Sequence, residues 1–214
     1  MKTWLVVVGI GLLLAACAPL GPGEQGELRY AGPVEIGIVR GELLPGTDIQ
    51  YLGKVADGAQ VSIRGEQALK KTGDSLNWEG DLMDGVAVDL ELRVALITEE
   101  ELHVVGTVQM TVSDPDPRPE PVNSGAPVRY KVPVAYRVEK GQAIPGSVVT
   151  YLGKTDDGAR LGNVEGYAYR QPGDSIVWEG KVRDRVWIEL DLRTVLFTDD
   201  ALNVAGTAEL WFAP

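Results

Sequence analysis

The chain has 214 residues, and its 31 acidic and 20 basic side chains give it a formal net charge of −11. So acidic a chain repels phosphate backbones, which argues against a nucleic-acid partner. Its single cysteine has no partner for an intrachain disulfide, and its single histidine leaves no Cys/His cluster for zinc, so we expect no metal and no other cofactor.

The N-terminal segment 1–16 has the layout of a secretory signal peptide. Lys2 precedes an uncharged apolar run from Trp4 to Leu14, and small residues follow the run. This run is shorter than the roughly 20 apolar residues that a membrane-spanning helix needs. The segment is therefore predicted to direct export rather than to cross the bilayer as an anchor.

Directly after the apolar run, Leu14-Ala15-Ala16-Cys17 resembles a bacterial lipobox. The resemblance implies that signal peptidase II cuts before a diacylated Cys17, and two acyl chains suffice for stable anchoring. It also implies a place in the bacterial cell envelope, at the outer membrane where the organism has one, because Ala18 rather than Asp follows the cysteine. The alternative is an ordinary signal peptide that contains a cysteine. Residues 17–28, rich in Gly and Pro, are predicted to be a tether.

The rest of the chain repeats itself with a shift of 100 residues. Residues 29–114 and 129–214 align without a gap, and 32 of the 86 positions are identical. The longest shared motif is Gly-Asp-Ser-x-x-Trp-Glu-Gly, at 73–80 and 173–180. We therefore expect two tandem duplicated domains, at 29–113 and 128–214.

Between the two copies lies the linker, residues 114–127, which is rich in proline. The stretch 113–127 contains five prolines in 15 residues. Proline cannot donate a backbone hydrogen bond, so we expect this segment to be extended, semi-rigid and unable to pair in a sheet.

Within each copy the apolar residues alternate with a period of two, which predicts β-strands. The clearest runs are 86–96 with 102–112, and 186–196 with 202–212. Shorter strands are expected near 33–40, 48–54, 60–70 and 75–83, separated by turn sequences such as LPGT and KTGD. The sequence thus predicts an all-β protein whose two domains are each a six-stranded, mainly antiparallel barrel or sandwich.

Residues 73–76, Gly-Asp-Ser-Leu, resemble the nucleophile block of the GDSL esterase/lipase family. That resemblance implies Ser75 as the nucleophile and a histidine in a late Asp-x-x-His motif. The one histidine, His103, has Glu100 in place of that Asp, and the second copy has Asn203 where His103 stands. A serine without a general base is a poor nucleophile, so we interpret Gly-Asp-Ser as a turn and expect no catalytic residue.

Two further groups of polar residues are open to a functional and a structural interpretation. Acidic turns at 99–101, 156–157 and 199–200 could ligate calcium, but none has the spacing of a calcium loop, so exposed hairpin turns are favoured. Four charged residues recur in the second copy, and we favour a shared structural device over a duplicated binding site. These residues are Asp74, Glu79, Asp84 and Arg93, which become Asp174, Glu179, Asp184 and Arg193.

The copies differ most informatively at Trp187 and Trp211, which replace Ala87 and Thr111. If Leu196 pairs with Leu202 across the hairpin turn, Trp187 lies opposite Trp211 on the face away from the core. Two indoles there could form a platform for a sugar ring or a partner protein. Alternatively, the first domain, the linker or Tyr167 and Tyr169 could cover them.

These features favour a lipid-anchored envelope lipoprotein with a non-enzymatic binding or scaffolding role. Its partners would be the membrane, through the lipid on Cys17, and an envelope protein or glycan. The alternative is a pilotin-like assembly factor that escorts a secretion or outer-membrane component by pairing through an exposed strand edge. A GDSL-type esterase using Ser75 is the least favoured hypothesis.

Overall fold

A computed structural model describes residues 26–214, and this part of the chain contains strands and turns but no helix. It confirms the predicted all-β class. The first half contains β1 (Glu27–Val39), β2 (Ile49–Val55), β3 (Gly58–Ile63), β4 (Glu66–Lys70), β5 (Trp78–Met83), β6 (Val86–Ile97) and β7 (Glu101–Ser113). The second contains β8 (Arg118–Pro119), β9 (Val128–Glu139), β10 (Thr150–Thr155), β11 (Gly158–Gly162), β12 (Tyr169–Arg170), β13 (Ser175–Arg183), β14 (Val186–Phe197) and β15 (Ala201–Phe212).

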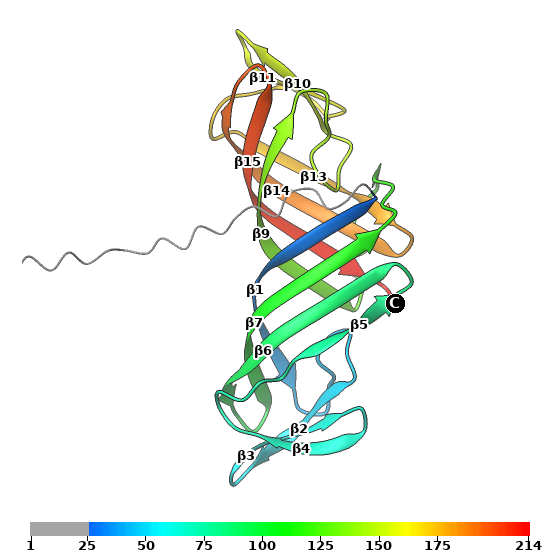
Figure 1. Ribbon diagram of the computed structural model, residues 1–214, viewed down its shortest axis with the longest axis vertical. Helices are drawn as coiled ribbons and strands as arrows, with labels where there is room; N and C mark the ends of the chain where they lie inside the picture. Colours follow the sequence, from blue (N-terminus) through cyan, green and yellow to red (C-terminus); the bar gives the residue numbers. More distant parts are fainter. Residues whose placement is uncertain (1–25) are drawn as a thin grey trace, which may run out of the picture.

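The strands form two large and two small antiparallel sheets. Large sheet 1 has the order β1-β7-β6-β5, and large sheet 2 has the matching order β9-β15-β14-β13 with β8 added at its edge. The small sheets are β2-β3-β4 and β10-β11-β12, and they lie at opposite ends of the molecule (Figure 1). None of these sheets closes into a barrel, which decides against the barrel alternative for the described residues.

The period-two pattern places the core where the sequence predicts it. Alternate residues of β6, from Val86 to Val94, are at most 2% exposed, and β14 repeats this burial from Val186 to Leu192. The pattern fails at one point near the end of each long hairpin. A β-bulge between Thr194 and Leu196 shifts the register, so that Leu196 faces Asn203 instead of Leu202 and is 49% exposed. The predicted Leu196–Leu202 pair is therefore wrong.

Each half also has seven strands from its repeat, rather than the six that the sequence predicts. In the first half, the predicted strand at 60–70 is split into β3 and β4 by a tight turn at Arg64 and Gly65. Both turn residues have positive φ, 54° and 82°, a conformation that ends an extended strand. In addition, β1 begins at Glu27, inside the predicted tether, while residues 1–16 and Cys17 lie outside the described residues.

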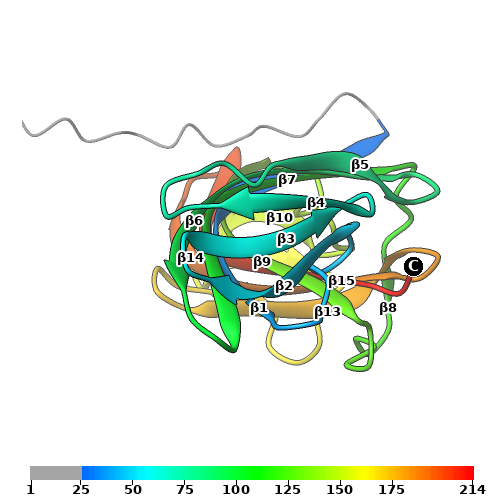
Figure 2. The same ribbon diagram turned by 90° about the horizontal axis from the view of Figure 1, so that it is seen from below.

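The buried side chains of the two halves form one continuous hydrophobic cluster. Strand β1 packs directly against β9, so closely that a β-carbon on Gly32 would lie 2.8 Å from Pro133 Cδ. The Tyr130 hydroxyl donates a hydrogen bond to Pro45 O of the first half at 2.8 Å. Viewed along the long axis, strands of both halves surround this shared interior (Figure 2). The repeats therefore stabilise each other through one core.

Three tyrosines in this interior make stability sensitive to alkaline pH. Burial raises the pKa of Tyr30, Tyr130 and Tyr136 well above the ordinary value, because the ionised phenolate would lose its hydration. Their neutral forms favour folding below the unfolded-state pKa of about 10, and this contribution is lost as pH rises above it. We expect cooperative unfolding above about pH 10, with the phenolate absorbance of these tyrosines appearing together with the loss of near-UV circular dichroism. Complete phenolate titration in a protein that keeps its native spectrum would contradict this.

Candidate binding grooves

The Gly-Asp-Ser motif forms the same turn in both halves. Gly73 has a positive φ of 92°, and the Asp74 carboxylate accepts the Lys71 N–H at 2.7 Å. The second half repeats this with φ 93° at Gly173 and a 2.7 Å bond from Gln171 N–H to Asp174. The turn needs a glycine in the left-handed conformation and a carboxylate that accepts a backbone hydrogen bond. This requirement explains why the Gly-Asp pair recurs in both halves.

Ser75 and His103 lie apart in the first large sheet. Ser75 pairs with Arg93 of β6, whereas His103 on β7 pairs with Leu96, three residues further along β6. The His103 Nε2 atom lies 3.2 Å from a Glu101 carboxylate oxygen. Within residues 26–214, His103 makes no hydrogen bond to Ser75, so the contact that the esterase resemblance requires is not present there.

The recurring charged residues divide into a structural and a groove-lining group. Arg93 donates to Gly73 O at 3.1 Å and Arg193 to Gly173 O at 3.4 Å, so each arginine holds the Gly-Asp-Ser turn of its own half. Glu79 and Glu179, by contrast, line surface grooves described below. In residues 26–214, no group of three or more acidic or histidine side chains is arranged to hold a metal ion.

The described chain also contains no helix that is long and apolar enough to cross a membrane.

Trp187 and Trp211 pair directly across β14 and β15, as the sequence predicts, but they are not an exposed platform. Their exposed fractions are 8% and 9%, because Val122 and Ala126 of the linker pack over them. The Trp187 Nε1–H donates to a Glu120 carboxylate oxygen at 3.1 Å. Of the alternatives open from the sequence, coverage by the linker is the one that the structure shows.

The linker binds to the second half along its length, and the prediction that it cannot join a sheet is wrong. Asp116 N–H donates to Val182 O at 2.7 Å, and Arg118 and Pro119 then pair with Lys181 and Gly180 as the two-residue strand β8. Proline is tolerated there because β8 is the outermost strand of the sheet. Its outer edge has no neighbouring strand and therefore needs no backbone N–H donor. The linker therefore acts as a strap on large sheet 2.

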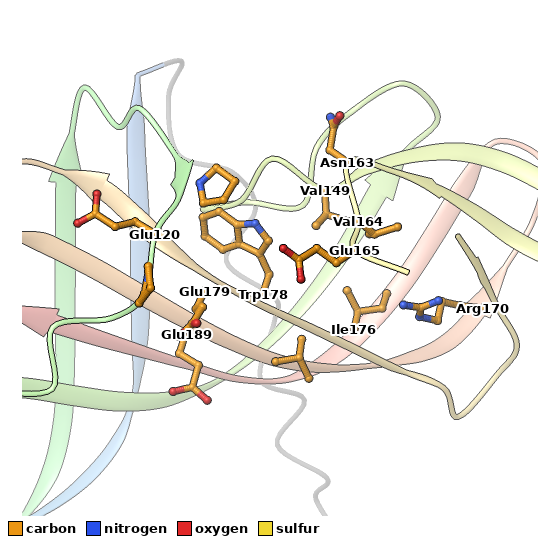
Figure 3. A pocket seen from close by; sticks show the side chains of 13 residues that line it. Glu120, Val149, Asn163, Val164, Glu165, Arg170, Ile176, Trp178, Glu179 and Glu189 are labelled. Atoms are coloured by element: carbon orange, nitrogen blue, oxygen red, sulfur yellow. The ribbon is translucent and has the colours of Figure 1, made fainter. Parts of the chain in front are cut away.

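Where the linker leaves the sheet edge, a groove of about 490 Å³ opens beside β13. We call it groove 2, and Figure 3 shows its lining. Its apolar wall includes Trp178, Ile176 and Val177, and four carboxylates lie around it. The carboxylates belong to Glu120, Glu165, Glu179 and Glu189. This volume lies in the range of sites that bind small ligands or short peptide segments.

The indole of Trp178 forms a wall of groove 2. It lies over Gly180, where a β-carbon would come within 2.2 Å of the indole Cη2, so the Trp-x-Gly spacing of the repeat leaves room for the ring. Trp178 is 8% exposed, and its Nε1–H has no hydrogen-bond partner among residues 26–214. The equivalent Trp78 Nε1–H donates to Asp48 Oδ1 at 3.0 Å, but the second half has Val148 in place of Asp48.

Groove 2 also exposes the unpaired edge of β13. Thr194 N–H donates to Asp174 O, and in an antiparallel pair the backbone bonds alternate from residue to residue. Between residues 174 and 181, the even-numbered residues therefore bond to β14, and the odd-numbered residues direct their N–H and C=O groups away from it. Strand β8 occupies this edge only at Gly180 and Lys181. The backbone groups of Val177 therefore face the groove without a neighbouring strand.

The acidic side chains of groove 2 lack cationic partners. Glu179 lies directly opposite Glu189, and Glu189 opposite Glu209. Lys131 lies 3.6 Å from Glu209, whereas no ion pair within 26–214 involves Glu179 or Glu189. The one arginine of the groove, Arg170, already donates to the backbone carbonyls of its own hairpin. Like charges directly opposite each other destabilise a sheet, so this arrangement favours a bound cation.

The first half has a matching groove 1 of about 500 Å³ beside β5. Trp78, Glu79 and Asp89 take the places of Trp178, Glu179 and Glu189. Groove 1 differs in having Arg64, which lies 3.3 Å from Asp48, and in having a satisfied indole. Neither groove was predicted from the sequence. The recurring Trp-Glu-Gly motif was the available signal, but it served only as evidence of the duplication.

No family model matches this chain, and no curated protein or solved structure matches it either.

Proposed function

We propose that this chain is a lipid-anchored, non-enzymatic binding protein of the bacterial cell envelope that holds its partner in groove 2. The lipobox-like Leu14–Cys17 supports the anchor, since a lone cysteine in an exported chain is otherwise without use. The acidic composition supports a partner other than nucleic acid.

The observation that carries the binding role is the unpartnered Trp178 N–H at the wall of an open groove. The Nε1–H makes no hydrogen bond within residues 26–214 and is open to the groove, so a ligand can supply the acceptor that Asp48 provides for Trp78 in the first half. A large apolar wall with a few unsatisfied polar groups is the usual composition of a recognition site.

The test is an affinity capture from native membranes with the intact lipoprotein. We expect Val177→Arg to abolish capture of the partner, because Val177 is 64% exposed and a long side chain there fills the groove without disturbing the core. Val195→Arg, at a 50% exposed valine of β14 outside the groove, is the matched control and keeps capture. Equal capture by all three proteins would contradict a binding role for groove 2.

The same preparation tests the anchor. Cys17→Ser is expected to move the protein from the membrane to the soluble fraction, because the acyl chains have no other attachment site. Mass spectrometry of the wild-type protein should find the N-terminal cysteine carrying acyl chains. An unmodified thiol on Cys17 would contradict the proposed anchor.

A second candidate is the assembly-factor role, which the free edge of β5 favours. Strand β5 ends large sheet 1, and no strand of the described chain covers it, whereas β8 covers part of the equivalent β13. An escort that adds a strand of its client to this edge would co-purify with a secretin or barrel protein. Loss of the client's assembly on deletion of this protein would separate this role from simple binding.

A further inference from the structure

We propose that groove 2 binds an extended, basic segment of a partner protein, which adds a strand to the free edge of β13 in line with β8. This inference rests on the proposed binding function and specifies its ligand. It combines a sheet edge, an indole N–H with no partner within residues 26–214 and a set of carboxylates without ion pairs in one place.

The chain itself supplies the precedent for such a ligand. Arg118 and Pro119 of β8 are an extended, basic dipeptide on the same edge, paired with Lys181 and Gly180. The next outward-facing edge position that the linker leaves free, Val177, continues this track into groove 2. Backbone hydrogen bonds along a free edge give affinity in strand addition, and pockets for alternate side chains give specificity.

The Trp178 indole N–H is open to groove 2 and available to an acceptor from the ligand. Trp178 is 8% exposed, and Figure 3 shows its nitrogen-bearing edge on the Glu165 side of the groove. An extended peptide carries a carbonyl at every residue, so it can accept the Nε1–H that Asp48 accepts from Trp78 in the first half.

The charges require a cation from the ligand. Glu179 and Glu189 face each other from adjacent strands, and Glu120 and Glu165 border the same groove. Since Arg170 is held by backbone carbonyls, the groove has an excess of negative charge. A lysine or arginine side chain on alternate positions of an added strand would lie over Glu179 and Glu189. An acidic or neutral segment would leave both carboxylates unpaired.

The test measures binding of a short fluorescein-labelled peptide of alternating valine and arginine by fluorescence polarisation, with the intact lipoprotein in a neutral detergent. Two further probes are the same peptide with glutamate for arginine, and the same peptide with an N-methyl group on every backbone nitrogen. We expect binding of the first peptide only, because the second repels the groove and the third cannot pair with the edge.

Protein variants separate the groove from general charge attraction. Glu179→Gln with Glu189→Gln is expected to weaken binding about tenfold, while Glu99→Gln with Glu100→Gln, which makes the same charge change in the exposed β6–β7 turn of the first half, leaves it unchanged. Val177→Pro is expected to abolish binding, because proline removes the outward-facing N–H that an added strand would use. The fold itself does not use this N–H, so the variant should still fold. Val177→Thr keeps the N–H and keeps binding.

Each of the following outcomes overturns the proposal. Equal weakening by the two double variants would show that the peptide responds only to net charge. Equal binding of the N-methylated peptide, or full binding by Val177→Pro, would show that no strand is added. If Val177→Arg blocks capture of a native partner while the basic peptide fails to bind, the proposed binding function stands and the ligand class inferred here is wrong.

Discussion

Replacing Gly206 with alanine is expected to lower the free energy of unfolding by about 3 kcal/mol, at the upper end for overpacked sites. Gly206 on β15 faces Leu192 on β14, and a β-carbon there would lie 2.0 Å from Asp191 O. The obstacle is backbone, so no side chain can rotate away, and the two central strands of large sheet 2 must separate. Gly106 has the same contact with Glu91 O, at 2.0 Å, which explains why both halves keep this glycine.

The measurement is urea unfolding with an unchanged slope, so that a shifted midpoint reports stability alone. Gly37→Ala is the control, because the atom that its β-carbon would meet belongs to the Glu101 carboxylate, which can rotate into solvent. We expect the control to change stability by less than about 0.5 kcal/mol, as at an ordinary surface position. Equal midpoints for Gly206→Ala and Gly37→Ala would show that the strands accommodate the methyl group.

Local sequence pattern predicted the class and the central hairpins well, because both depend on nearest neighbours in a sheet. The alternation in β6 and β14 fixes which side chains face the core, and burial from Val86 to Leu92 agrees with it. The Trp187–Trp211 pair is also correct. The Leu196–Leu202 pairing from which it was predicted is wrong. The tryptophan pair is unaffected because the bulge after Thr194 changes the register only beyond the region that contains the tryptophans.

What could not be predicted depends on contacts between segments distant in sequence. The proline-rich composition of the linker indicates an extended chain, but nothing local shows that Arg118 and Pro119 reach the β13 edge. Groove 2 depends on this path, because the linker forms one wall and β13 the other. Its carboxylates come from residues as distant as Glu120 and Glu189, so no spacing rule brings them together.

The differences between the halves follow from the path of the linker. Large sheet 2 has Trp187 and Trp211 where large sheet 1 has Ala87 and Thr111, and the linker covers only the tryptophans. The indoles thus supply the apolar surface that holds a segment with few apolar residues of its own. The tryptophans hold the linker beside groove 2, while the edge of β13 next to Trp178 stays open. The anchoring of the linker therefore determines the shape of the groove.

Replacing Trp187 with alanine is therefore expected to lower the free energy of unfolding by about 3 kcal/mol and to release the linker. The substitution removes a buried indole from between Val122, Ala126 and Trp211, together with the bond to Glu120. Hydrogen exchange of the linker amides is the direct measurement, and the Asp116 N–H, bonded to Val182 O in the native protein, should lose its protection.

Trp187→Phe is the matched control, because it keeps most of the apolar volume and loses only the bond to Glu120. It is expected to lower the free energy of unfolding by about 1 kcal/mol, with the Asp116 amide still protected. If Trp187→Ala loses stability while that amide stays protected, the backbone pairing of β8 holds the linker without the indoles, and the tryptophan pair serves the sheet alone.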